Sequence, residues 1–425
     1  GDELEEFYKN GIFSEKIYKI EKDLRPVLRE IEKIGFLIDV KFLKKLGGKV
    51  LEDLEKIKKE VIKLAGEEFN LNSTHELGRI IFEKLALGGK KIKKTKTGIY
   101  STASDELEKI REAHPIIPLM IKWRELSKIQ STYIDALPRL VSAKDGRIHT
   151  TFRQFGAVTG RLSSENPNLQ NIPTKGEYGL EIRKAFIAPE GFLILSADYT
   201  QIELRIAAVL SGDPKMIETF KRGEDIHTRT AAEIFNVPME KVTKEMRREA
   251  KTLNFGILYG MGARAFSRSA GVSFSDAQEF IHEYESDFSG LAKFMREMRE
   301  KAKAQGYVET MWGRKRHLPE LSSQNPMLRS AGERMAINMP IQGTAADIIK
   351  SAMAGIQKRI GKEKDIKMIL QVHDELVFEV KKESVKKYAD VIREEMENAV
   401  KLSVPLDVEI ETGENWGELR ALPKK

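Results

Sequence analysis

The sequence predicts an α+β fold, in which helical segments alternate with a small antiparallel sheet. Apolar residues recur at helical spacing over residues 1–65, which is typical of amphipathic helices. Residues 192–197 instead form a near-continuous apolar run of strand length, and this pattern indicates a buried strand. Two more strands, residues 367–372 and 376–380, are separated by only three residues, which predicts a hairpin.

Composition excludes several classes of protein. The 425 residues include 72 Lys plus Arg and 65 Asp plus Glu, so the formal net charge is +7. Charged residues make up 32% and hydrophobic residues 41%, which excludes a disordered chain and a membrane protein, so no membrane partner is expected. The absence of cysteine excludes disulfides and thiolate zinc sites. The length predicts roughly three domains or subdomains.

Residues 1–65 are predicted to be mostly helical, with one short strand at residues 36–40. Between Lys84 and Ser104 the chain has no acidic residue and is punctuated by glycines, which predicts a basic loop. Its lysines are Lys84, Lys90, Lys91, Lys93, Lys94 and Lys96. Such a loop is either a solvated tip or a contact to a phosphate backbone, and the run alone leaves both interpretations open.

Two acidic residues stand where predicted strands end. The apolar strand at residues 192–197 ends at Asp198, and a helix is predicted to start near Gln201; Asp374 lies at the tip of the C-terminal hairpin. A carboxylate at the end of a buried strand needs a hydrogen bond, a cation or a metal. If the two strands are neighbours, the carboxylates converge and form an oxygen-rich site for Mg²⁺. The alternative is that Asp198 begins a helix and Asp374 forms a turn.

A helix with an unusual face is predicted from about Lys244 to about Tyr259, after Thr243 as its N-cap. Positions 247, 251, 255 and 259 carry Arg, Lys, Phe and Tyr and lie within one stripe, because each step of four residues drifts by only about 40°. A nucleotide suits this stripe: phosphates would meet the cations, and base and sugar the aromatic rings. Gly256 costs the helix about 1 kcal/mol relative to Ala, so something is expected to approach closely there. The alternative is an amphipathic helix with salt-bridged cations.

Three segments resemble the sequence motifs of family A DNA polymerases, of the bacterial DNA polymerase I type. Residues 198–205 (DYTQIELR) resemble motif A, residues 247–260 (RREAKTLNFGILYG) motif B, and residues 371–376 (QVHDEL) motif C. Further family blocks match in the same order at residues 159–164 (TGRLSS), 168–173 (NLQNIP) and 338–344 (NMPIQGT). The resemblance extends from about Leu24 to the C-terminus. Thr200 departs from the usual Ser, with little expected consequence because both residues carry small hydroxyls.

The resemblance implies a right-hand architecture with an antiparallel palm sheet, helical fingers and a helical thumb. The palm would take residues 24–45, 143–224 and 325–425, the thumb 46–142 and the fingers 225–324. Residues 1–23 are expected to be an N-terminal remnant or linker. The nuclease domains of relatives would not fit there, so we expect no exonuclease activity from this chain.

The resemblance also implies a catalytic centre with two Mg²⁺ ions, for which Mn²⁺ could substitute. Asp198, Asp374 and the backbone carbonyl of Tyr199 would be the metal ligands. Glu375 would support the site, and Lys251 could protonate the departing pyrophosphate.

Substrate contacts follow from the same motifs. Residues expected to contact the incoming dNTP are Arg247, Lys251, Phe255, Tyr259, His227, Glu203 and Gln201, with Glu203 as the steric gate against a ribose 2′-hydroxyl. Residues expected to contact DNA are Arg161, Gln342, Asn338, Asn168, Gln170, Asn72, Ser73, Lys91, Lys93, Lys94 and His373. Within this set Arg161 and Gln342 would read minor-groove acceptors, which are nearly the same in all correct pairs.

The implied function is template-directed extension of a DNA primer 3′ end with dNTPs. The implied partners are primer–template DNA and dNTP, with a monomer in the cytoplasm of a bacterium or phage-infected cell; an organelle origin also remains open. Two alternatives were weighed: a single-subunit phage-type RNA polymerase and a catalytically silent DNA-binding module. Glu203 with Phe255 favours deoxynucleotides over the first, and the intact carboxylates argue against the second.

Overall fold

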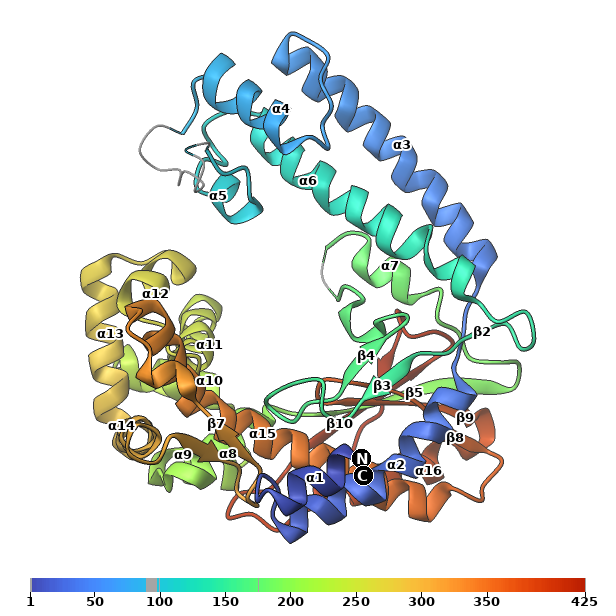
Figure 1. Cartoon of the computed structure of the whole chain (residues 1–425), viewed down its shortest axis with the longest axis vertical. Coiled ribbons are helices and arrows are strands. Elements are labelled where there is room, and N and C mark those ends of the chain that lie inside the picture. Colours follow the sequence, from blue (N-terminus) through green and yellow to red (C-terminus); the bar gives the residue numbers. More distant parts are fainter. Residues whose placement is uncertain (1, 89–97, 99, 175, 425) are drawn as a thin grey trace.

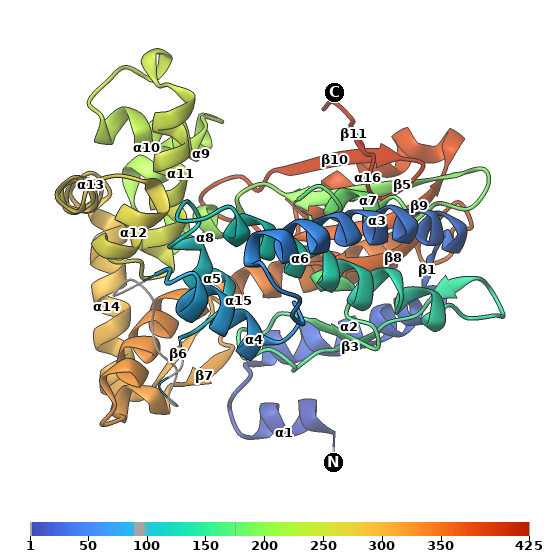
Figure 2. The same ribbon diagram turned by 90° about the horizontal axis from the view of Figure 1, so that it is seen from above.

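The computed structural model describes residues 2–88, 98, 100–174 and 176–424, and it has the predicted α+β fold. Two helical arms rise on either side of a central antiparallel sheet (Figure 1). The N-terminus with α1 and the C-terminus with β11 lie on opposite sides of the molecule (Figure 2). Among the described helices, none combines the length and the apolar character that crossing a membrane requires.

The central sheet is built from strands far apart in the sequence. Its order is β11-β10-β5-β9-β8, and every neighbouring pair is antiparallel. The strands are β5 (Phe192–Tyr199), β8 (Ile366–Val372), β9 (Glu375–Lys381), β10 (Val408–Gly413) and β11 (Arg420–Ala421). The predicted strand and hairpin are confirmed, and β5 pairs directly with β9 of the hairpin. This pairing meets the condition under which the two strand-end carboxylates converge.

Long helices pack on this sheet and bury its apolar side chains. They are α2 (Glu15–Ile34), α15 (Pro326–Ile360) and α16 (Val385–Glu397), and α8 (Ile202–Ser211) follows β5 and packs on α15. Short elements around the sheet are α1 (Glu3–Lys9), β1 (Phe36–Leu37), β2 (Arg147–Ile148), β3 (Thr151–Arg153), β4 (Ser163–Glu165), η5 (Leu169–Asn171), α7 (Gly179–Arg183) and η8 (Lys382–Ser384). The strand predicted at residues 36–40 is therefore only two residues long.

One arm is an antiparallel pair of helices with a small helical cap at its far end (Figure 1). Its elements are α3 (Val40–Ala65), α4 (Thr74–Gly78), η1 (Arg79–Lys84), α5 (Ser104–Glu108), α6 (Ile116–Ile129), η3 (Gln130–Ile134) and η4 (Leu137–Leu140). Five of the six lysines of the predicted basic loop fall within residues 89–97, which lie outside the described residues. Its first lysine, Lys84, pairs with Glu67 at 2.8 Å.

The other arm is a compact group of helices that carries the predicted cationic and aromatic stripe. Its elements are α9 (Pro214–Lys221), α10 (Ile226–Ile234), η6 (Met239–Lys241), α11 (Lys244–Leu258), α12 (Ala263–Ala270), α13 (Phe274–Asp287), α14 (Ser289–Gln305), β6 (Tyr307–Glu309), β7 (Lys315–His317) and η7 (Pro319–Ser322). Helix α11 begins after Thr243, whose hydroxyl accepts a hydrogen bond from the Met246 amide, as an N-cap does.

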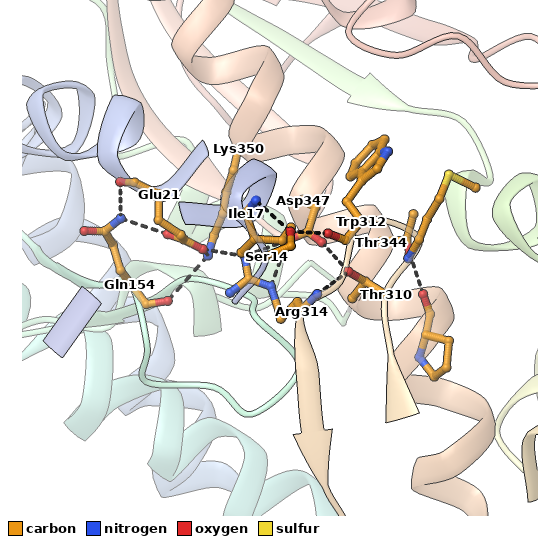
Figure 3. A network of polar contacts seen from close by, with 12 residues as sticks. Ser14, Ile17, Glu21, Gln154, Thr310, Trp312, Arg314, Thr344, Asp347 and Lys350 are labelled. Atoms are coloured by element: carbon orange, nitrogen blue, oxygen red, sulfur yellow. Dashed lines mark hydrogen bonds and ion pairs between the residues drawn. The ribbon is translucent and has the colours of Figure 1, made fainter. Parts of the chain in front are cut away.

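A buried polar network joins α2, α15 and the β6–β7 hairpin (Figure 3). Lys350 Nζ lies 2.6 Å from Glu21 Oε1, and the Arg314 guanidinium reaches both Glu21 Oε1 at 2.5 Å and Asp347 Oδ1 at 2.6 Å. Thr310 donates to the other Asp347 oxygen at 2.8 Å. Two cations and two carboxylates therefore neutralise each other where the hairpin meets the sheet helices. Glu21 belongs to α2, which runs through the expected boundary at residues 23 and 24.

Candidate active site

Three acidic residues gather where β5 and β9 lie side by side. Asp198 is the register partner of Glu375, and the Tyr199 amide donates to the Asp374 carbonyl at 3.2 Å. His373 and Asp374 form the two-residue turn of the hairpin, in which His373 has a positive φ of 54°. Sheet pairing alone thus brings residues 198 and 374 to one edge.

The electrostatics of this edge indicate uncompensated negative charge. Two effects raise the pKa of Asp198 to about 7: the larger is the loss of solvation by surrounding protein, and the smaller is repulsion from Glu375 and Asp374. Part of the Asp198 side chain is nevertheless exposed to solvent. Burial and the Glu203 carboxylate raise the pKa of Asp374 to about 6, and Arg161 opposes the rise.

The donor set at this edge fits a hard divalent cation. Two carboxylates and the Tyr199 carbonyl offer oxygen ligands only, as Mg²⁺ prefers, and a bound cation would relieve the repulsion between the acids. Within the described part of the chain, no three His, Cys, Asp or Glu side chains form a complete metal site. The remaining ligands would therefore come from substrate oxygens and water, which is usual for Mg²⁺ beside phosphates.

Glu375 is held in place by two neutral donors. Ser196 Oγ donates to its Oε1 at 2.7 Å and Trp416 Nε1 donates to the same atom at 2.9 Å. Arg183 stacks on the Trp416 ring at 3.9 Å and lies 4.0 Å from the other carboxylate oxygen. Because one oxygen of Glu375 already accepts two hydrogen bonds, this residue is suited to supporting the metal ligands from beside the site, as expected from the sequence.

The stripe of α11 faces this edge across one cavity of about 390 Å³. The cavity brings together all seven of the expected dNTP contacts, and its lining residues are Arg161, Gln201, Ile202, Glu203, His227, Arg247, Lys251, Phe255, Tyr259, His373 and Asp374. A carboxylate edge, a cationic helix and two aromatic rings thus share one space. Gln201 sits at the start of α8 with a positive φ of 53°.

The cationic end of the stripe is engaged with α10. Arg247 Nε donates to Asp225 Oδ2 at 2.5 Å, and the other oxygen of Asp225 caps α10 at the His227 amide. The ring of His227 lies 5.6 Å from that of Phe255, and its Nδ1 meets the amide nitrogen of Asn254 at 2.9 Å. The alternative of salt-bridged cations therefore holds for Arg247, whose ion pair coexists with the cavity, but no ion pair to Lys251 is found among the described residues.

The aromatic end of the stripe is tied to Glu203, which is 6% exposed. The Tyr259 hydroxyl donates to Glu203 Oε2 at 2.6 Å, and Arg161 donates to Oε1 at 2.5 Å. Burial, together with the Glu203 carboxylate, raises the pKa of Tyr259 above its ordinary value. Gly256 is approached closely, as predicted, but by the chain itself: a Cβ there would lie 2.7 Å from Met261 Sδ.

The expected DNA contacts are only partly gathered here. Gln170 donates to the Gln371 side chain at 3.0 Å, and Gln371 donates to the His373 carbonyl at 2.5 Å, which links η5 to the hairpin turn. Asn168 caps η5. Asn338 and Gln342 lie on α15, where Asn338 Oδ1 is buried without a partner among the described residues.

Other expected contacts lie far from the cavity, on the outer part of the first arm. Asn72 accepts from Trp123 Nε1 at 3.1 Å, and Ser73 caps α4. Lys91, Lys93 and Lys94 lie outside the described residues. Asp225 and Asn254 were not predicted as site residues. An Asn inside a helix is unfavourable by propensity, and this is the sequence signal for Asn254.

Comparison with known proteins agrees with this geometry. Residues 40–418 match the family model of DNA polymerase family A. The chain is 47% identical over 399 residues to DNA polymerase I, thermostable, of Thermus aquaticus, and 43% identical over 417 residues to DNA polymerase I of Geobacillus stearothermophilus. These alignments cover 94% and 98% of this chain, and 48% and 47% of the relatives, so the chain spans about half their length.

A solved structure supports the same relationship and the right-hand polymerase fold. The POL domain of Pol1 from M. smegmatis, in complex with DNA primer-template and dNTP, superposes with a TM-score of 0.88 at 39% identity. The match covers 93% of this chain and 70% of that one. The family model alone spans far more than half of the sequence. The chain therefore belongs to DNA polymerase family A.

Proposed function

We propose that this chain is a template-directed DNA polymerase that extends a primer 3′ end with dNTPs. The observation that carries the proposal is the single cavity in which Asp374 faces Arg247, Lys251 and Phe255, with Asp198 on the strand beside it. A nucleoside triphosphate has the matching order of groups, because its phosphates need cations and metal while its base needs an aromatic surface.

Asp198, Asp374 and the Tyr199 carbonyl would hold two Mg²⁺ ions, with Mn²⁺ as a substitute. When bound, these ions lower the pKa of the primer hydroxyl and neutralise the triphosphate. The protein supplies the positions: β5 carries Asp198 beside the hairpin turn that carries Asp374, and Ser196 and Trp416 hold Glu375 next to them.

Helix α11 would bind and orient the nucleotide. Arg247, Lys251 and His227 would hold the phosphates, and Lys251 could give its proton to the departing pyrophosphate. Phe255 would pack on the sugar and base. Tyr259 would stack at the templating position and move away when a pair forms there.

Selection among nucleotides would depend on residues at the cavity floor. Glu203 would exclude a ribose 2′-hydroxyl, and its bonds to Tyr259 and Arg161 hold its carboxylate in the lining of the cavity. Arg161 and Gln342 would contact minor-groove acceptors of the new pair, testing pair shape rather than sequence. Gln201 is proposed as a further contact to the dNTP, and Asn338, Asn168, Gln170 and His373 are proposed as further contacts to the DNA.

The proposed division into subdomains follows the arms. The sheet with its helices is the palm (residues 24–45, 143–224 and 325–425), which also takes α9 and the first turns of α3. The rest of the arm of α3 to α6 is the thumb (46–142), and the arm from α10 to α14 is the fingers (225–324). Asn72 and Ser73 lie on the outer thumb, where they and the basic loop would follow the duplex backbone.

The decisive test is primer extension by Asp198→Ala and Asp374→Ala on a DNA template with Mg²⁺. We expect each to lose at least about a thousandfold in rate while primer–template affinity changes less than about threefold. Glu409→Ala is the matched control, because this exposed acid is the register partner of Asp198 on β10 and should leave extension intact. Normal extension by either Asp variant would refute the assignment. Preferential incorporation of rNTPs would instead favour the single-subunit RNA polymerase. DNA binding without any turnover would favour the catalytically silent DNA-binding module.

A further inference from the structure

Behind the phosphate-binding side of the cavity, three buried polar side chains form a chain of hydrogen bonds. His227 on α10 is 2% exposed, and its Nδ1 lies 2.9 Å from Asn254 Nδ2 on α11. Asn254 is 1% exposed, and its Oδ1 accepts from the Thr230 hydroxyl at 3.1 Å. Thr230 is fully buried and also lies 2.8 Å from the Ile226 carbonyl.

The chemistry of these groups determines where the proton of the imidazole sits. An amide nitrogen is only a donor, so the His227 Nδ1 that faces it must be an acceptor and carry no proton. A neutral imidazole has one N–H, and that proton must then be on Nε2. On its other side, Asn254 Oδ1 lies 3.1 Å from the Thr230 hydroxyl, whose single proton is shared with the Ile226 carbonyl at 2.8 Å.

The surroundings keep the ring neutral. Burial, together with the nearby cations Arg247 and Lys251, lowers the pKa of His227 to about 4, although the Asp225 carboxylate opposes them. These are the charged groups that face the ring from α10 and α11. At neutral pH the ring is therefore uncharged, and its donor capacity depends only on which nitrogen holds the proton.

The position of that proton matters because His227 lines the cavity next to Arg247 and Lys251. With Nδ1 occupied by Asn254, Nε2 is the ring nitrogen left for a ligand. An Nε2–H can donate a hydrogen bond to a phosphate oxygen. An unprotonated Nε2 could not, because its lone pair would face a lone pair of the phosphate oxygen and the two would repel each other.

We propose that Asn254 is a positioning residue that holds His227 as the Nε2–H tautomer, so that the ring donates a hydrogen bond to a phosphate oxygen of the incoming nucleotide. The tautomer follows from the contact between His227 and Asn254; its use on the nucleotide rests on the proposed function. Asn254 itself need not touch the substrate, because it acts through the ring.

The first experiment reads the tautomer directly and needs no activity. The imidazole nitrogens are observed by ¹⁵N NMR in the intact chain labelled with ¹⁵N-histidine, and the spectrum of His227→Gln identifies the His227 signals among those of the seven histidines. At pH 7 we expect a protonated Nε2 and an unprotonated Nδ1. A proton on Nδ1, or on both nitrogens, would overturn the proposal.

The second experiment measures its consequence for nucleotide binding. Asn254→Asp keeps the shape of the side chain but replaces the donor by a carboxylate, which would draw the ring proton to Nδ1 and raise the pKa of His227. Single-turnover extension with dATP opposite a templating dT gives the apparent Kd for dATP and the rate at saturation. At pH 8.5 we expect the Kd of Asn254→Asp to be about tenfold higher than that of the parent. The Kd should recover as the pH falls and the ring gains its second proton, while the saturating rate stays within about twofold.

The control background is His227→Gln, in which no imidazole remains to be positioned. There Asn254→Asp should leave the Kd for dATP unchanged at every pH. The same pH-dependent weakening in this background would overturn the proposal, as would a Kd of Asn254→Asp that equals the parent's at all pH values. If the parent itself fails to extend a primer, the proposed function fails, while the tautomer measured by NMR stands on its own.

Discussion

Lys350→Met tests whether the buried charge network stabilises the junction of α2, α15 and the β6–β7 hairpin. Lys350 and Glu21 are both fully buried, and Arg314 and Asp347 complete a group with no net charge. Removing the ammonium leaves one carboxylate in excess, while the methionine keeps the apolar stem and fills most of the space. Breaking a buried ion pair from one side costs about 3–5 kcal/mol. Since Arg314 still contacts Glu21, we expect Lys350→Met to lower the free energy of unfolding by about 3 kcal/mol, at the lower end of this range.

The same helix supplies a matched control. Lys358 Nζ lies 3.1 Å from Asp23, so it also links α15 to α2, but its side chain is 70% exposed. Lys358→Met should therefore lower the free energy of unfolding by only about 0–1 kcal/mol. The two variants differ in burial far more than in the geometry of the ion pair.

The assay is equilibrium unfolding in guanidinium chloride, with tryptophan fluorescence and circular dichroism checked for coincident transitions. Adding Glu21→Gln to Lys350→Met restores charge balance, so the double variant should be more stable than Lys350→Met alone by about 1 kcal/mol or more. The reasoning is refuted if Lys350→Met costs no more than Lys358→Met. It is also refuted if the second substitution lowers stability by as much as Glu21→Gln does alone.

Three more predictions concern the cavity and its supports. Glu203→Ala should admit ribonucleotides at least about tenfold more readily relative to dNTPs, measured as the ratio of kcat/KM; an unchanged ratio would refute the gate. The pKa of His227 is about 4 in the folded chain, below the ordinary 6.5, so the unfolded state takes up the proton first as pH falls. Stability should therefore drop by about 2–3 kcal/mol between pH 6.5 and 4, and His227→Gln should remove that part of the loss; equal acid sensitivity of both chains would contradict it. Gly343→Ala would place a Cβ 2.5 Å from Thr310 Cγ2 and 3.0 Å from the Thr159 carbonyl, so we expect a loss of about 1–3 kcal/mol in the free energy of unfolding. Gly355→Ala on the same helix meets only the mobile end of Glu395 and should be neutral or stabilising, so equal losses would refute the steric argument.

Local pattern was enough to predict the elements that carry the chemistry. The β5 strand, the hairpin around Asp374 and the helix capped by Thr243 all follow from periodicity and capping, because these signals lie within a few residues of one another. Strand β10 was not predicted, although it completes the sheet beside Asp198. Its short alternating segment offers little to distinguish it from a loop.

Contacts between distant segments could not be predicted in this way. Glu21 and Lys350 are 329 residues apart, and neither position departs from an ordinary helical pattern. The pair Arg247–Asp225 spans 22 residues and a turn between two helices, so no periodicity relates the two. Likewise, an Asn at position 254 breaks local propensity, but only the packing of α10 against α11 shows which group it faces.

The ion pairs in the cavity explain how its charged side chains are stabilised when no substrate is bound. Arg247 is paired with Asp225, and Glu203 holds both Arg161 and Tyr259, so each group already has a partner. Under the proposed function, a nucleotide would exchange these internal bonds for bonds to itself, and the net gain per contact would be modest. Asp198 and Asp374 differ, because no cation pairs with them among the described residues and their pKa values are raised. The largest electrostatic gain on assembly would therefore arise at the two carboxylates, where metal and triphosphate arrive together.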